Sequence, residues 1–186
     1  DNLAIGHSAM GTDTAGGNHN LAIGNYTLDA LTSGDSNIAI GNSAMGAATT
    51  AGSNTAIGYQ ALDANTTGNI NVAIGYDALG SLTTADANVA VGREALASVT
   101  TGTRNTGLGT SAGMTATTVS DNTSLGYAAL KDNTAASNTA VGSYALTENT
   151  TGGDNTAVGH TSLYTNTTGA GNTAIGRETL YYNTTG

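Results

Sequence analysis

The chain contains no cysteine, proline, tryptophan or phenylalanine, and charged residues make up only 9% of its 186 residues. Without cysteine there are no disulfide staples, although this absence does not locate the protein. The cations are Arg93, Arg104, Lys131 and Arg177, and the formal net charge is −9. Because there is no basic patch, the composition argues against nucleic acid or an anionic membrane as a partner.

Long apolar runs are also missing from the chain. No stretch approaches the ~20 apolar residues that span a bilayer, so we expect no membrane insertion of this segment. The first residues already belong to a repeat, so we expect no signal peptide there. A secreted form would then be a mature product or an excerpt of a longer chain.

One short unit is repeated from end to end. The bias toward glycine, threonine, asparagine and alanine often indicates disorder, but here it is strictly periodic. The glycine of an Ala-Ile-Gly step recurs every 17 residues, with one interval of 18 and one of 16. A period this short predicts a solenoid, and we treat residues 1–186 as a single array of eleven units.

We number each unit from its asparagine, which is position 0. These asparagines are Asn2, Asn20, Asn37, Asn54, Asn71, Asn88, Asn105, Asn122, Asn138, Asn155 and Asn172. Position 2 is alanine except at Gly107 and Ser124, and position 3 is always aliphatic. Position 8 is leucine or methionine except at Gly113, and position 12 is always threonine.

The unit predicts two short strands and two corners. In a strand over positions 1 to 3, positions 1 and 3 share one face and position 2 the other. Positions 6 to 8 predict a second strand, with the glycine of position 4 turning the corner between them. The Asn-Thr-Thr-Gly segment predicts another turn, and a helix is disfavoured by glycine, threonine and asparagine. We therefore predict an all-β fold, a parallel β-roll or β-solenoid of eleven coils of about 17 residues.

Stacked coils place like residues in ladders. An asparagine side chain carries a donor and an acceptor, so we expect it to bond to its copies above and below. We expect the aliphatic residues of positions 3 and 8 to fill the core. The ladder residues that we single out are Asn54, Ile57, Gly58, Leu62, Asn71, Ile74, Gly75 and Leu79.

The predicted core is thin. Two large apolar side chains contribute roughly 3–6 kcal/mol per coil, which is less than the cost of ordering the coil. We therefore expect several chains to pack side by side along the rod. Both ends are ordinary repeat sequence without an atypical cap, which predicts either a window of a longer fibre or a subunit that stacks end to end.

The unit Asn-Thr-Ala-Ile-Gly-x-x-Ala-Leu resembles the head repeat of trimeric autotransporter adhesins (YadA-like), where Asn-Ser-Val-Ala-Ile-Gly-x-x-Ser-x-Ala recurs. It is also similar to the Asn-Thr-Ala-Ile-Gly repeats of bacteriophage tail fibres. The resemblance covers all eleven units. It implies left-handed coils, a homotrimeric rod and exposure outside the cell. The present unit departs from the adhesin repeat by an added Asn-Thr-Thr-Gly turn.

Catalytic chemistry finds little support in the sequence. No nucleophile, base and orienting acid share a motif, and His7 and His160 lie nine units apart. We expect no enzyme, no cofactor and no metal site. Acids near the corners, such as Asp35, Asp121 and Asp154, are expected to be solvated turn residues, with an isolated metal site as the alternative.

Tyrosines recur just after the position-4 glycine, and they are candidate surface or interface contacts. Tyr59, Tyr76 and Tyr127 occupy position 5, and Tyr144 occupies position 6. Exposed tyrosines on a rod could stack on sugar rings, or they could pack at a chain–chain interface, which we favour.

The threonines of position 12 form a second candidate surface, represented by Thr66, Thr83 and Thr100. A flat rank of threonines at the ~4.8 Å strand spacing could order water in an ice-like array. Asn-x-Thr/Ser sequons follow largely from the repeat itself and are weak indicators of glycosylation. They begin at Asn25, Asn65, Asn122, Asn149, Asn166 and Asn183.

Together with these patterns, the resemblance implies a structural segment of an extracellular fibre or adhesin, on a cell surface or a virion. It would act by self-association, as a homotrimer, and by multivalent surface display. The alternatives are a self-polymerising extracellular filament subunit and an ice-binding solenoid that uses the threonine ladder. Expected partners are the chain itself and a glycan or host-surface receptor, which the sequence does not name.

Overall fold

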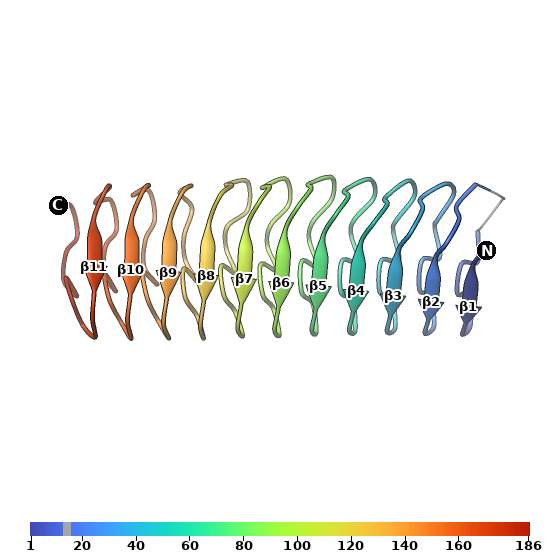
Figure 1. The fold of residues 1–186 in the computed structure, drawn as a ribbon, viewed down its shortest axis with the longest axis horizontal. Helices are drawn as coiled ribbons and strands as arrows, with labels where there is room; N and C mark the ends of the chain where they lie inside the picture. The colour runs from blue at the N-terminus through green and yellow to red at the C-terminus, as the bar shows by residue number, and fades with distance from the viewer. Residues whose placement is uncertain (13–15) are drawn as a thin grey trace.

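The computed structural model describes residues 1–12 and 16–186. Its eleven strands form a single parallel sheet in chain order, in one row along the rod (Figure 1). The strands are β1 (Leu3–Ile5), β2 (Leu21–Ile23), β3 (Ile38–Ile40), β4 (Thr55–Ile57), β5 (Val72–Ile74), β6 (Val89–Val91), β7 (Thr106–Leu108), β8 (Thr123–Leu125), β9 (Thr139–Val141), β10 (Thr156–Val158) and β11 (Thr173–Ile175). No helix occurs within those ranges, and the prediction of an all-β parallel solenoid is confirmed.

Neighbouring strands pair in the register of the repeat, even across units of unequal length. Leu3 lies opposite Leu21 across the long first unit. The side chain of Asn2 reaches the carbonyl of Gly17, 15 residues ahead, whereas Asn20 reaches that of Gly34, 14 residues ahead. The extra residue therefore precedes Gly17, and residues 13–15 lie outside the described residues.

The short eighth unit also keeps the strands in register. Thr123 in β8 lies opposite Thr139 in β9. The amide of Asn133 donates to the oxygen of the residue two positions ahead, whereas that of Asn149 donates to the residue three ahead. The deletion therefore shortens the turn and leaves the strand intact.

Positions 6 to 8 do not form a second strand, so that prediction is wrong. The φ angles of Gln60 and Leu62 are 54° and 53°, in the left-handed region that an extended strand does not use. Ala61 and Leu62 are adjacent, yet both are 0% exposed. A strand would send them to opposite faces, whereas the turn directs both side chains inward.

The strand presents the opposite face to the core from the one expected. Ala73 is 0% exposed, whereas Ile57 and Ile74 are each 36% exposed. The expectation that position 3 fills the core is therefore wrong. Position 8 does fill it, because Leu62 and Leu79 are 0% exposed.

Space inside the coil explains this reversal. A Cβ placed on Gly107, at position 2, would lie 2.8 Å from Cγ of Leu96, a position-8 leucine. At Gly107 not even a methyl group fits without a shift, and at Ala73 the same position admits a fully buried alanine. The interior therefore has no room for a second branched side chain. The period-2 alternation of the strand holds, with its small residue inside.

Position 11 supplies the rest of the interior. Leu82 and Val99 are fully buried there, and so is Asn65. The Asn65 amide donates to the carbonyl of Gly68 at 2.9 Å, and the N–H of Gly68 donates back at 2.8 Å. The sequence predicted a turn here, because a polar residue beside glycine is typical of turns, but it did not predict that the asparagine is buried.

The apolar core is interrupted between the seventh and eighth units. One cluster of buried residues extends from Met10 to Ala116, and the other from Ala129 to Ala174. Between them Ser124 takes the place of alanine, and its hydroxyl donates to the Thr106 carbonyl at 3.0 Å. Strands β7 and β8 remain paired, so the pattern break removes apolar packing and not backbone pairing.

Candidate functional site

The position-0 asparagines form a buried ladder that holds each coil to the next. The N–H and Nδ2 of Asn71 donate to Oδ1 of Asn54 at 2.9 and 3.2 Å. Nδ2 of Asn71 also donates to the carbonyl of Ala85, at the end of its own unit, at 2.8 Å. Oδ1 of Asn71 accepts from the N–H of Asn88 at 2.9 Å. Each side chain thus closes its own coil and joins the neighbouring coils.

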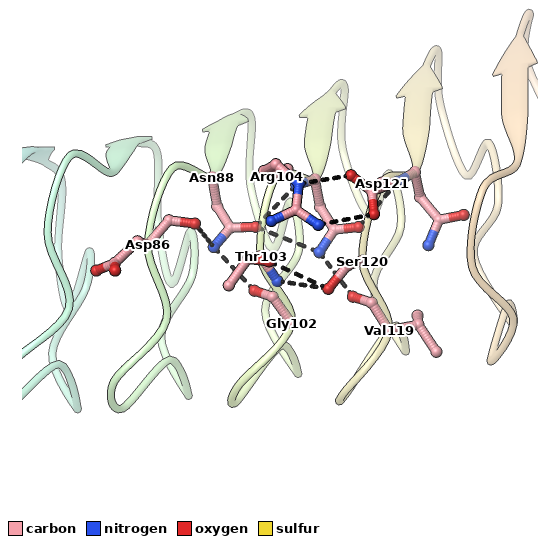
Figure 2. Close-up of polar contacts among 10 residues, drawn as sticks. Asp86, Asn88, Gly102, Thr103, Arg104, Val119, Ser120 and Asp121 are labelled. Atoms are coloured by element: carbon pink, nitrogen blue, oxygen red, sulfur yellow. Dashed lines mark hydrogen bonds and ion pairs between the residues drawn. The ribbon is translucent and has the colours of Figure 1, made fainter.

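Figure 2 shows this ladder at the corner of the sixth to eighth units. Nδ2 of Asn88 donates to the carbonyl of Gly102 at 2.9 Å. Outside the ladder, the guanidinium of Arg104 donates to both carboxylate oxygens of Asp121, at 2.7 and 2.9 Å. The bond from Arg104 lowers the pKa of Asp121. This corner acid is therefore an ion-pair partner on the surface, and exposed pairs of this kind contribute little to stability.

The ladder has one defect, in the shortened eighth unit. Asn122 is only 3% exposed, and its Nδ2 has no hydrogen-bond partner among the described residues. In regular units this atom reaches the carbonyl 14 residues ahead, as Asn105 does with Val119. The deletion shifts that carbonyl out of place, so the eighth coil lacks the polar bond that closes the regular coils.

The position-12 threonines form a hydrogen-bonded ladder of their own. The hydroxyl of Thr66 donates to the carbonyl of Thr83 at 3.0 Å, and Thr83 donates to Thr100 at 3.2 Å. Thr100 donates in turn to Thr117 at 3.1 Å. A hydroxyl has one proton to donate, so these threonines do not present a rank of free donors to water. The ice-binding alternative stays a prediction from the sequence.

The outward side of the sheet carries an aliphatic side chain at position 3 of every unit, beside position 1, which is threonine in six of the eleven strands. We call it the strand face: the side chains of positions 1 and 3 in β1 to β11. Ile38, Ile57 and Ile74 are 40%, 36% and 36% exposed, and Leu125 reaches 43%. A contiguous exposed apolar surface of this kind is typical of a site of association.

Two of the tyrosines form a closed pair. The rings of Tyr59 and Tyr76 are stacked, with centroids 5.4 Å apart and an interplanar angle of 8°. The guanidinium carbon of Arg93 lies 5.7 Å from the Tyr76 ring centre. The two rings therefore cover each other's inner faces, and with Arg93 they join three successive coils on the outside.

A second group, which we call the tyrosine track, crosses the last four units. It consists of Tyr127, Tyr144, Tyr164, Tyr181 and Tyr182, with successive ring centroids 5.1, 6.4, 5.1 and 4.6 Å apart. Sequence reasoning singled out Tyr127 and Tyr144 but missed the other three. The signal was present, because Tyr164 and Tyr181 both occupy position 9 of consecutive units.

Acidic side chains on neighbouring coils repel one another near the middle of the rod. Burial raises the pKa of Asp63, opposed by a hydrogen bond from the N–H of Gly46. Burial also raises the pKa of Asp77, and the charges of Glu94 and Asp63 raise it further. These carboxylates therefore disfavour the folded state when they are ionised.

The change Asp77→Asn is expected to raise stability at pH 7. An acid with a raised pKa in the folded state binds its proton more tightly there, so stability is lost as pH rises from about 4 through the raised pKa. Asparagine removes this loss and tolerates the φ of 54° at this position. We expect a gain of about 0.5 kcal/mol at pH 7, allowing for screening, and no gain below about pH 4.

Urea denaturation at pH 7 and at low pH measures this effect. Asp121→Asn is the matched control, because Arg104 lowers the pKa of Asp121. Its contribution is present above the ordinary aspartate pKa and is lost as pH falls, so this control should reduce stability at pH 7. A loss of stability at pH 7 in Asp77→Asn would contradict the argument.

The structure does not bring the histidines together. His7 packs edge-on against Tyr26 in the first coils, and His160 lies beside Thr161 near the other end. Within residues 1–12 and 16–186 no group of three or more histidine, cysteine or acidic side chains could hold a metal ion. The same ranges contain no helix that could cross a membrane.

Most of the sequon asparagines are buried in the folded chain. Asn65, Asn149 and Asn166 are 0% exposed, and Asn122 is 3% exposed. The side-chain nitrogen of Asn149 donates to the Gly152 carbonyl at 2.7 Å, inside the coil. Asn25 is exposed, so it is the accessible sequon in the first ten units.

No family model matches the chain, and no curated protein or solved structure matches it significantly. The fold by itself defines the class, a parallel β-solenoid built from a unit of about 17 residues. The resemblance to adhesin heads and tail fibres remains a prediction from the repeat sequence.

Proposed function

We propose that this chain is a structural segment of an extracellular fibre, which self-associates laterally through the strand face. The observation that carries the proposal is the aliphatic residue at position 3 of every unit, directed outward along all eleven strands. Association of a few chains removes this surface from water, at about 25 cal/mol per Å² of apolar area. Three chains around one axis is the arrangement that the repeat resemblance implies, and we adopt it.

The interior supports the same proposal. Position 2 contributes only a small residue to the core, position 8 usually a leucine, and position 11 a leucine or valine in some units. The aliphatic side chain of position 3 in each unit therefore lies outside the core. Ile57 and Ile74, for example, are each 36% exposed in the single chain, although coils flank them on both sides. A second chain packed on the strand face would complete the burial. The fibre would act by its length and rigidity and by repeated display of its other faces.

Light scattering after size-exclusion chromatography, over a range of concentrations, tests this proposal. We expect a mass near three chains that does not change with concentration. Species that grow far beyond this mass would favour the alternative, an end-to-end filament. A single-chain mass at every concentration would overturn lateral association.

A pair of charged substitutions on the strand face should abolish the association. Ile38→Lys and Ile74→Lys place charges at exposed positions of β3 and β5, where the folded single chain can accommodate them. We expect a single-chain mass and an unchanged far-UV circular dichroism spectrum, because burying unpaired charges in an interface is costly.

The matched control carries the same charges in the same two units, but on a different face. Asn42 and Tyr76 occupy position 5 and are exposed. The double variant Asn42→Lys and Tyr76→Lys should keep the mass of the parent. If the control dissociates and the strand-face variant does not, the interface lies on the other face.

A further inference from the structure

We propose that the tyrosine track is a binding surface for a neutral, linear polysaccharide. This proposal names a class of ligand for the surface display proposed above. It rests on the proposed function only in assuming that several chains display the track together. The track occupies positions 5, 6, 9 and 10, whereas self-association uses positions 1 and 3. The two proposals therefore concern different surfaces and can fail separately.

Ring orientation is the first argument. Tyr127 and Tyr144 meet at 78°, Tyr144 and Tyr164 at 64°, and Tyr181 and Tyr182 at 67°. In an edge-to-face pair one ring does not cover the outer face of the other, whereas Tyr164 and Tyr181 are stacked at 13° and cover only their inner faces. Tyr127 is 51% exposed and Tyr182 is 83% exposed. The C–H face of a pyranose ring can pack against such an aromatic face, whose π-system carries negative charge.

Hydrogen-bonding groups beside the rings are the second argument. A hollow of about 540 Å³ is lined by Glu178, Tyr181 and Tyr182. Burial raises the pKa of Tyr181, and smaller contributions come from Tyr164, Tyr182 and the nearby carboxylates of Glu148 and Glu178. Carboxylates and phenol groups beside aromatic faces suit a ligand with many hydroxyl groups, because they accept and donate hydrogen bonds.

The net negative charge of the last four units favours a neutral ligand. From Asn122 onward the chain has four acids and two cations, Lys131 and Arg177. The guanidinium of Arg177 is already paired with Glu178 at 2.8 Å. An acidic polysaccharide or a nucleic acid would meet carboxylates with little compensation, whereas a neutral chain loses nothing by this charge.

The course of the track selects a linear ligand. Tyr127, Tyr144, Tyr164 and Tyr181 come from four consecutive units, and the strands of those units are paired in order from β8 to β11. Successive coils are stacked at about 4.8 Å, so the rings extend along the rod. A single sugar would contact one or two rings, and a chain of sugars can contact them all.

Titration of the full chain with oligosaccharides, followed by tyrosine fluorescence and calorimetry, tests the proposal. The chain has no tryptophan, and five of its eight tyrosines belong to the track, so its fluorescence reports mainly on this surface. The probes are cellohexaose, xylohexaose and mannohexaose, with hexagalacturonate as the acidic comparison. We expect at least one neutral probe to bind more tightly than the acidic one.

The variant Tyr144→Ala with Tyr164→Ala should weaken this binding at least tenfold. Both changes should fold, because Ala128 occupies position 6 of the eighth unit and Ala97 occupies position 9 of the sixth. The variant Tyr144→Phe with Tyr164→Phe keeps the rings and should stay within about threefold of the parent, a difference of roughly 0.7 kcal/mol.

The matched control is Tyr59→Ala with Tyr76→Ala, which removes the closed pair. It should leave binding unchanged, since Tyr59 and Tyr76 lie in the fourth and fifth units, outside the track. Failure of all three neutral probes to bind would overturn the proposal, and so would equal losses in the control and the track variant. The chain mass measured on the same samples shows separately whether lateral association holds.

Discussion

Replacing Asn71 with alanine is expected to lower the free energy of unfolding by about 3 kcal/mol. Asn71 is 0% exposed, and its side chain serves both adjoining coils. Without it, the N–H of Asn88 loses its acceptor and the carbonyl of Ala85 loses its donor. Each buried polar group left without a partner costs about 1–3 kcal/mol, so the cost exceeds that of the side chain alone.

The change Asn71→Asp should be more damaging at pH 7. It preserves shape but places an ionised carboxylate against Oδ1 of Asn54 and the carbonyl of Ala85, two acceptors that need a donor. Burial and these acceptors favour the protonated acid in the folded state, so stability should recover as pH falls. The Asp variant should therefore approach or exceed the Ala variant in stability at low pH.

Urea denaturation followed by far-UV circular dichroism measures both changes. The control is Asn42→Ala, at an exposed site where the side chain accepts only from the neighbouring Ser43 hydroxyl, at 3.1 Å. We expect the control to differ from the parent by less than about 0.5 kcal/mol. If Asn71→Ala were as stable as the control, the ladder would not hold the coils together.

Replacing Gly75 with alanine is the second change with a large expected effect. The φ of Gly75 is +138°, and a Cβ there would lie 2.5 Å from the carbonyl oxygen of Gly92 in the next coil. That atom belongs to the backbone and cannot move without separating the coils. We expect a loss of about 3 kcal/mol or more, because the clash adds to a backbone strain of about 1–3 kcal/mol.

Gly176→Ala separates these two costs. Gly176 has a comparable φ of +124°, but its Cβ would meet only the methyl group of Thr179, at 3.2 Å. We expect this control to show the backbone strain without the contact between coils. The difference in stability loss between the two variants then measures the cost of the contact between the new Cβ at position 75 and the Gly92 carbonyl oxygen. Equal losses in the two variants would mean that φ alone requires glycine at the corner.

The repeat identified two members of the tyrosine track, but it did not show which other tyrosines they meet. Tyr127 and Tyr144 were visible as recurrent tyrosines next to the corner glycine. Their meeting with Tyr164 and Tyr181 depends on how positions 5, 6 and 9 lie on one surface, which follows from the turns after position 4. A sequence period gives the order of residues within a coil but not the angles between its segments.

The sequence by itself determined the solenoid, the strands of positions 1 to 3, the corner glycines and the asparagine ladder. These features follow from a fixed period and from local chemistry: only glycine accepts the corner φ, and only a donor–acceptor side chain bonds to its own copies. The tertiary structure decided which side of each strand is inside. Leu62 and Ala61 both enter the coil from a turn, and the remaining width admits Ala73 and not Ile74. Available volume is a property of the whole coil, so the repeat could not specify that its aliphatic face lies outside.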